Sequence, residues 1–181
     1  MHSGLKRVVL VAALLTFSPR WTLAEDSRWS AGVRHGFSAT SYDDPFHQTE
    51  LFGILDLPHH PPWRFATDSG WYIQSRVIGS AGALSGQNQT GFVGSLGASI
   101  IFGQKHFPLY LDTGISPTFL SRDEFGSVNF GMPYQFTTYG GLYLRYARIS
   151  VGYRFQHMSN AHLAEPNPGL DLHVIGITYH F

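Results

Sequence analysis

The alternation of apolar and polar residues is clearest near the C-terminal end of the chain. From Ile149 to Phe155 the apolar residues take the odd positions, and small or polar residues take the even positions. The segment 171–181 alternates in the same way and ends on Phe181. Because successive residues of a β-strand point to opposite faces, both segments are predicted to be strands with one apolar face.

The same reading, extended along the chain, predicts eight strands separated by turns rich in Gly, Pro, Asn and Asp. They are placed at 29–40, 47–57, 71–82, 90–103, 108–120, 134–146, 148–160 and 171–181. Eight short strands without a long helical pattern predict an all-β fold, an eight-stranded antiparallel transmembrane β-barrel. A barrel of this size is expected to have an interior filled by side chains.

Composition favours the membrane form of such a barrel. Aromatic residues make up 15% of the chain and charged residues only 13%, and the 20 glycines suit tight turns. A terminal aromatic residue on an alternating last strand is typical of the assembly signal of bacterial outer-membrane barrels. A soluble edge strand has a similar pattern, but the N-terminal segment favours export.

Residues 1–24 have the three parts of a secretory signal peptide in order. Lys6 and Arg7 precede an apolar run at 8–17, and Thr22 and Ala24 occupy the positions that a signal peptidase reads. The apolar run is too short to cross a bilayer as a helix. We therefore expect a signal peptide at 1–24 and an outer-membrane β-barrel domain at 25–181.

Charge and cysteine content narrow the function classes. Loss of Lys6, Arg7 and Arg20 from the 12 basic residues leaves 9 against 12 acidic residues, a net charge of −3. This balance gives no support for nucleic-acid binding. The chain has no cysteine, which excludes disulfides and thiol chemistry.

His157 and Ser159 stand two residues apart on one predicted strand, so their side chains share a face. That face carries Phe155 and is expected to contact lipid, where a histidine and a serine are unfavourable unless they are hydrogen-bonded. Asp171 begins the next strand on the matching register of an antiparallel hairpin, within reach of His157. The set suggests a nucleophile, Ser159, a base, His157, and a carboxylate, Asp171, that orients the base.

The expected position of this set indicates its substrate. With both termini in the periplasm, the connection between the last two strands is extracellular. Asp171 lies ten residues before the C-terminus, which corresponds to about 25 Å of height in a tilted strand. The apolar band of such barrels is about 25 Å tall, so the set lies near the outer rim. An esterase there faces lipopolysaccharide, the lipid of the outer leaflet in Gram-negative bacteria.

Two stretches resemble the PagL family of lipid A 3-O-deacylases. The first is Arg154-Phe155-Gln156-His157-Met158-Ser159-Asn160-Ala161, and the second is Pro166-Asn167-Pro168-Gly169-Leu170-Asp171. The family has a His-x-Ser-Asn-Ala motif, a Pro-Asn-x-Gly turn and then an acidic residue. The similarity is clearest over residues 107–181.

The resemblance implies hydrolysis of the 3-hydroxyacyl ester at position 3 of lipid A, in the cell outer membrane, without a metal or other cofactor. It implies the catalytic roles of Ser159, His157 and Asp171 given above, and a role for Asn160 in the oxyanion hole. Two positions differ from the family pattern: Asp171 stands where Glu is usual, and His162 stands where Gly commonly follows Asn-Ala.

The partners expected from these observations are lipid A or lipopolysaccharide as substrate, the lipids of the outer membrane, and the barrel assembly machinery acting on Phe181. A homodimer remains open. Two other functions also remain open: a non-enzymatic structural or adhesin barrel with a degenerate site, and an acyltransferase that uses a lipid as acceptor.

The other ionisable residues are expected to have structural roles. His59 and His60 lie in a Pro-rich segment without an evident third metal ligand. Five further histidines are expected to be interfacial or pairing residues, and the one at 173 shares the face of the catalytic set. They are His35, His47, His106, His173 and His180. A buried charge network in the lumen is expected from Arg34, Arg76, Arg145, Arg154 and Asp112.

Overall fold

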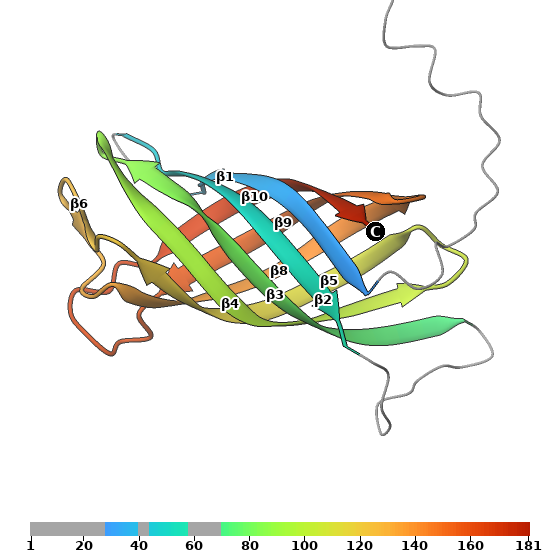
Figure 1. Cartoon of the computed structure of the whole chain (residues 1–181). Coiled ribbons are helices and arrows are strands. Elements are labelled where there is room, and N and C mark those ends of the chain that lie inside the picture. Colours follow the sequence, from blue (N-terminus) through green and yellow to red (C-terminus); the bar gives the residue numbers. More distant parts are fainter. Residues whose placement is uncertain (1–27, 40–43, 58–69) are drawn as a thin grey trace, which may run out of the picture.

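The computed structural model describes residues 28–39, 44–57 and 70–181, and within them eight strands close into one antiparallel barrel (Figure 1). Going round the barrel, the order is β1-β10-β9-β8-β5-β4-β3-β2. The strands are β1 (Trp29–Ser38), β2 (His47–Asp56), β3 (Trp71–Gly86), β4 (Gln89–Gln104), β5 (Leu109–Leu120), β8 (Tyr134–Tyr146), β9 (Ile149–Ser159) and β10 (Leu170–His180). The predicted fold class is confirmed. The expected signal peptide, 1–24, lies outside the described residues.

Strand ends differ from the prediction mainly at the β3–β4 hairpin. β3 continues to Gly86, and only Gln87 and Asn88 separate it from β4. Both have positive φ, 51° and 57°, as the two central residues of a tight hairpin turn require. The small hairpin of β6 (Glu124–Phe125) and β7 (Val128–Asn129) was not predicted, because two-residue strands leave no alternation to detect.

The outer face of the barrel is apolar. Alternate residues of every strand point outward, and many of the exposed ones are aliphatic, such as Leu51, Leu96, Leu111, Leu144 and Ile177. Aromatic residues, among them Trp29, Trp71, Phe119, Tyr134 and Tyr179, are exposed nearer the strand ends. This is the surface of a membrane barrel. Within the described residues, no helix is long and apolar enough to cross a membrane.

The lumen holds buried ion pairs. Arg34 Nε lies 2.6 Å from Glu50 Oε2, and Arg76 Nη2 lies 2.6 Å from Asp112 Oδ2. Arg154, 2% exposed, donates to Gln156 Oε1, and its guanidinium stands 4.2 Å from the centroid of the Tyr139 ring. The first pair joins the neighbouring strands β1 and β2, and the second joins β3 to β5 across the face of β4.

The network differs from the expected one at two residues. Arg145 lies opposite the inward-facing Ser150 but is only half-buried, and its Nε donates to the carbonyl of Ala147, so it stands at the margin of the lumen network. Glu50, the carboxylate that pairs with Arg34, was not predicted. The reason is that β2 alternates weakly, and Glu50 could be assigned inward only once its pairing with Gly82 and Arg34 was known.

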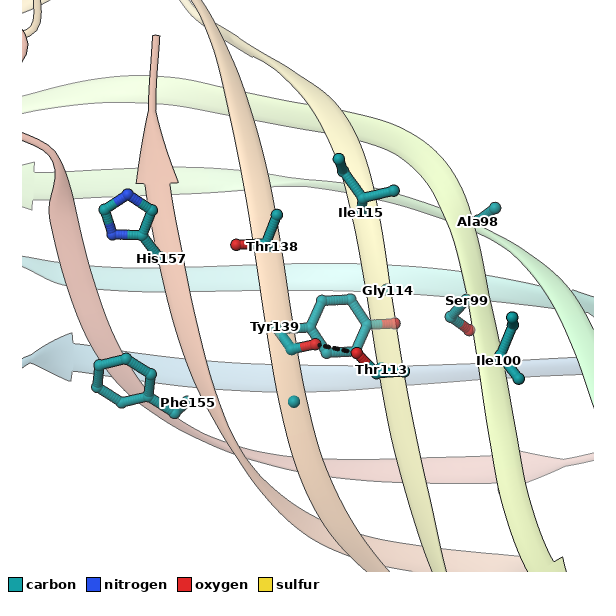
Figure 2. Close-up of a pocket in the computed structure, with 11 residues that line it drawn as sticks. Ala98, Ser99, Ile100, Thr113, Gly114, Ile115, Thr138, Tyr139, Phe155 and His157 are labelled. Atoms are coloured by element: carbon teal, nitrogen blue, oxygen red, sulfur yellow. Dashed lines mark hydrogen bonds between the residues drawn. The ribbon is translucent and has the colours of Figure 1, made fainter. Parts of the chain in front are cut away.

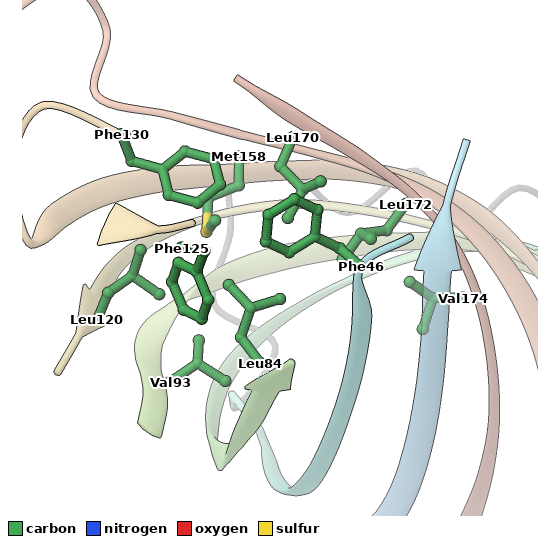
Figure 3. Close-up of a cluster of buried hydrophobic side chains, with 10 residues drawn as sticks. All are labelled: Phe46, Leu84, Val93, Leu120, Phe125, Phe130, Met158, Leu170, Leu172 and Val174. Atoms are coloured by element: carbon green, nitrogen blue, oxygen red, sulfur yellow. The ribbon is translucent and has the colours of Figure 1, made fainter. Parts of the chain in front are cut away.

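A hydrophobic cluster closes the end of the barrel that carries the loops 121–133 and 160–169. Its ten side chains come from five of the barrel strands, from β6 and from the adjoining loops (Figure 3). They are Phe46, Leu84, Val93, Leu120, Phe125, Phe130, Met158, Leu170, Leu172 and Val174. In the orientation expected from the sequence, this cluster lies at the extracellular end of the interior, and it supports the ends of β9 and β10 from inside.

The ion pair of Arg76 and Asp112 leads to a stability prediction. Asp112→Ala leaves Arg76 buried without a carboxylate, and we expect the free energy of unfolding to fall by about 3–5 kcal/mol. The double variant Arg76→Met, Asp112→Leu removes both charges and should recover most of that loss. Urea unfolding of the barrel in lipid vesicles, followed by tryptophan fluorescence, measures both. A single variant as stable as the wild type would contradict the prediction.

Candidate active site

The hairpin of β9 and β10 brings His157 and Asp171 together on the outer face. The two residues are directly opposite in the antiparallel register. His157 Nδ1 lies 2.7 Å from Asp171 Oδ1, and the side chains are 47% and 38% exposed. The imidazole is therefore oriented by a carboxylate while its other edge stays accessible, as a base acting on a bound substrate requires.

Ser159 is the last residue of β9 and stands two positions beyond His157. Because side chains alternate along a strand, its hydroxyl leaves the barrel on the same outer face as the imidazole. It is half-buried where His157 is exposed. The three residues singled out in the sequence thus lie at adjacent outward positions of one hairpin.

Asp171 reaches His157 although its side chain is one methylene shorter than the Glu usual in the resembling family. The direct cross-strand position accounts for this, because opposed Cβ atoms of antiparallel strands lie only about 4.5–5.5 Å apart. The observed 2.7 Å separation needs no longer side chain.

Gly169 packs against the imidazole of His157 and was not recognised in the sequence as part of the site. A Cβ atom there would lie 3.0 Å from Cε1 of His157 and 3.8 Å from its Nε2. Its φ of +70° is also one that glycine adopts most easily. The turn-forming segment Pro166-Asn167-Pro168-Gly169 was the only feature of the sequence that pointed to this glycine.

Asn160 is fully buried, and its side chain joins two extracellular loops. Nδ2 donates to the carbonyls of Phe130 at 2.9 Å, Ala164 at 2.9 Å and Pro166 at 3.3 Å. Its backbone N–H donates to Asn167 Oδ1 at 3.1 Å. The amide hydrogens expected to act in an oxyanion hole are thus engaged by backbone carbonyls, and the side chain holds the loop that follows Ser159.

The turn after Asn160 has two residues in the left-handed conformation. Ala161 and His162 have φ values of 54° and 61°, and the N–H of Leu163 donates to the carbonyl of Asn160 at 3.1 Å. Glycine fits such a turn best, which explains the Gly common at the second position in the resembling family. His162 keeps the same conformation here.

A groove on the outer face begins at His157 and crosses β8, β5 and β4 (Figure 2). It has a volume of about 590 Å³. Its lining is mostly apolar or small: Ala98, Ser99, Ile100, Thr113, Gly114, Ile115, Thr138, Tyr139, Gly140, Phe155 and His157. The outward Cα of Gly140 has no atom within 4 Å of the place where a Cβ would be, so this glycine keeps the groove open.

The remaining histidines do not gather into a metal centre in the part of the chain that the structure describes, where no group of three His, Cys, Asp or Glu residues could hold an ion. His59 and His60 lie outside that part. His180 is buried between two hydroxyls, with Nδ1 2.9 Å from Ser30 Oγ and Nε2 2.8 Å from Ser150 Oγ. His180 therefore links β1, β10 and β9 where the barrel closes.

Comparison with known proteins connects this geometry to a family. The profile described as "Lipid A 3-O-deacylase (PagL)" matches residues 47–180, which include the hairpin, the groove and both loops joined by Asn160. The chain belongs to this family. It is thus a member of the lipid A 3-O-deacylases and an outer-membrane β-barrel, as expected from the sequence.

Two relatives are consistent with this membership. The lipid A deacylase PagL of Bordetella bronchiseptica (strain RB50) is 38% identical over 73 residues, which are 40% of this chain and 41% of that protein. The aligned part thus spans less than half of that relative. A crystal structure of the outer membrane enzyme PagL superposes with a TM-score of 0.65 at 20% identity, over 83% of this chain and 99% of the other. At that identity it establishes the shared fold.

The contact between Gly169 and His157 yields a test of the site. We expect Gly169→Ala to displace the imidazole and lower ester hydrolysis at least about tenfold, because a Cβ contact at 3.0 Å forces the ring to shift by a few tenths of an ångström. Gly70→Ala is the matched control. Gly70 also has a positive φ, 79°, but its Cβ would meet nothing closer than 3.6 Å, far from His157. Equal activity of the two variants would contradict the assignment.

Proposed function

We propose that the protein is a lipid A 3-O-deacylase that uses Ser159, His157 and Asp171 as a catalytic triad. The observation that carries the proposal is the hydrogen bond between His157 and Asp171 on the outer face of a membrane barrel. A hydrogen-bonded histidine and aspartate that face lipid do not belong to the lumen network, because that network lies on the opposite side of the strands. A lipid ester is the substrate that can reach them.

The proposed chemistry assigns one role to each of the three side chains. His157 takes the proton of Ser159 as its Oγ attacks the ester carbonyl, and Asp171 stabilises the imidazolium that forms. Collapse of the tetrahedral intermediate breaks the bond to the 3-oxygen of the glucosamine, which leaves as the hydroxyl with the proton from His157. A water molecule then releases the 3-hydroxy fatty acid from Ser159 by the same two steps, with His157 again as base.

The groove beside His157 suits the acyl chain of such an ester. It is lined by apolar and small side chains and opens toward the lipid from which the chain must come. An alkyl chain in it exchanges contact with lipid for contact with protein at little cost. The groove therefore serves to position the carbonyl relative to Ser159.

Asn160 contributes to this function by shaping the loop after the nucleophile. Its Nδ2 atom is engaged by three carbonyls, so we assign the stabilisation of the oxyanion to main-chain N–H groups of the turn that it opens. The side chain of Asn160 then acts as a positioning residue, by holding that turn against the loop of Phe130.

Export and assembly complete the proposal. Residues 1–24 are removed as a signal peptide, and the exposed terminal Phe181 is the feature that the barrel assembly machinery would recognise. The described residues require no second copy for the triad or the groove, and a homodimer would leave this chemistry unchanged.

Mass spectrometry of lipid A from cells that express the protein tests the function. We expect loss of one 3-hydroxyacyl chain, and we expect Ser159→Ala and Asp171→Asn to reduce that loss at least about 10³-fold in rate. Well-folded protein in the outer membrane with unchanged lipid A would contradict the proposal and support a non-enzymatic barrel. Added acyl mass would identify an acyltransferase.

The role of the groove has its own test. Gly140→Leu should fold normally, because nothing lies within 4 Å of its Cβ position, but the new side chain fills the groove. We expect activity on long-chain esters to fall at least about tenfold and activity on short-chain esters to be retained. Gly53→Leu, on the outer face of β2 and equally free of neighbours, is the matched control. If both variants hydrolyse long-chain esters alike, the acyl chain lies elsewhere.

A further inference from the structure

Three imidazoles lie together on the outer face beside the triad, on the side opposite to the groove. His173, on β10, packs against Phe37 of β1 with ring centroids 5.4 Å apart. His35 of β1 stacks on His47 of β2 at 5.6 Å. Phe37 is directly opposite both His173 and His47 in the strand register. We call the surface formed by His35, His47 and His173 the imidazole band.

Hydrogen bonds orient two of these rings. His35 Nδ1 lies 2.8 Å from Thr49 Oγ1, and His173 Nδ1 lies 2.8 Å from the hydroxyl of Tyr153. The second nitrogen of each ring has no hydrogen bond to a described residue. Each therefore offers one donor or acceptor to a ligand, while its orientation is set by the protein.

The stagger of the strands determines the height of the band in the membrane. Residues that are directly opposed on neighbouring strands form a row around the barrel. The row that starts at His47, the first residue of β2, comes back to β2 at Leu57, just past its last residue and ten positions further along the chain. The row passes through Phe37, His173, Phe155, Gly140, Thr113, Ile100 and Ser75. It thus descends from the extracellular end of β2 to the periplasmic end. For eight strands this stagger corresponds to a tilt of about 40°.

The descent separates the band from the groove. With that tilt, each step to the next strand of the row lowers a residue by about 3 Å, and each residue along a strand changes height by about 2.5 Å. His173, His35 and His47 then lie within about 5 Å of the height of His157. Gly140 lies about 8 Å and Ile100 about 14 Å below His157.

The two sides of the triad therefore meet different layers of the membrane. The groove enters the hydrocarbon, where an acyl chain belongs. The imidazole band stays level with the triad near the outer rim, where polar side chains remain hydrated or meet headgroups. A lipid ester with its carbonyl at Ser159 has its acyl chain on the first side and its alcohol part on the second.

The chemistry of the band fits a sugar ring. It offers imidazole nitrogens and the hydroxyls of Thr49 and Tyr153 as donors and acceptors, beside the aromatic faces of Phe37 and Phe155. Among the described residues that form it there is no lysine or arginine, so a bare anion gains little there. Such hydrogen-bonding groups next to aromatic faces match hydroxyls and C–H faces of a sugar.

We propose that the imidazole band binds the sugar headgroup of the lipid whose acyl chain lies in the groove, and that His35 and His173 determine specificity for it. The proposal rests on the proposed function, because it assigns the alcohol side of the same ester. Headgroup and acyl chain held on opposite sides of His157 place the ester bond over the hairpin of β9 and β10.

The test compares two substrates with the same acyl chain in the same detergent micelles, a 3-O-acyl glucosamine and a p-nitrophenyl ester. His35→Phe and His173→Phe keep an aromatic ring on a face that tolerates it, so folding is preserved. We expect each to raise KM for the sugar ester about tenfold, as loss of one or two hydrogen bonds does, and to lower its kcat/KM relative to the p-nitrophenyl ester. His106→Phe, at the turn beyond β4, is the matched control with unchanged selectivity.

Each outcome decides one of the two proposals. An unchanged ratio of the two kcat/KM values, or an equal loss on both substrates, overturns the role of the band and leaves the esterase function standing. Hydrolysis that persists in Ser159→Ala overturns the proposed function instead. A separate binding experiment measures the role of the band without hydrolysis, by comparing Ser159→Ala with the double variant Ser159→Ala, His35→Phe. A Kd for the sugar ester that is about tenfold higher in the double variant supports the role of the band, and an unchanged Kd overturns it.

Discussion

Side-chain alternation in a closed barrel is the constraint on which the rest of the structure depends. Each strand residue points either into the lumen or toward lipid, and closure leaves no edge at which this rule is relaxed. Polar lumen residues such as Arg76 and Asp112 find one another across the interior. Polar residues on the outer face have no such partners from the lumen. Their presence there, at His157 and Asp171, supports the proposal that the protein acts at its outer surface.

Much of this could be predicted from the sequence because it depends on local alternation. The odd apolar positions from Ile149 to Phe155 determine which face meets lipid, and the hairpin connection places Asp171 opposite His157. The loops are different. Asn160 contacts Phe130, thirty residues away, and no pattern near either residue encodes that contact. The sequence indicated that Asn160 matters, whereas its role in joining two loops required the folded chain.

The stagger of the barrel was also beyond prediction from the sequence. A single hairpin fixes one register, but the ten-residue stagger is a property of eight pairings taken together. The groove is one consequence, because Gly140 adjoins Thr113 and Phe155 only in that register. The glycine pair at 140–141 was the feature of the sequence that could have indicated the groove, since a glycine inside a strand often marks a site that a ligand approaches closely. Gly141 instead makes room for Arg154 in the lumen.

The same stagger supports the proposal that one hairpin serves a substrate with two unlike ends. If opposed residues ran level round the barrel, the positions on both sides of His157 would meet the same layer of the membrane. Because the rows descend, the side of β8 reaches hydrocarbon while the side of β10 and β1 stays near the headgroups. The proposed catalytic residues then need no cleft that excludes water on all sides. The membrane itself orients the lipid, and the hairpin needs only to hold His157, Ser159 and Asp171 at the height where the ester bond lies.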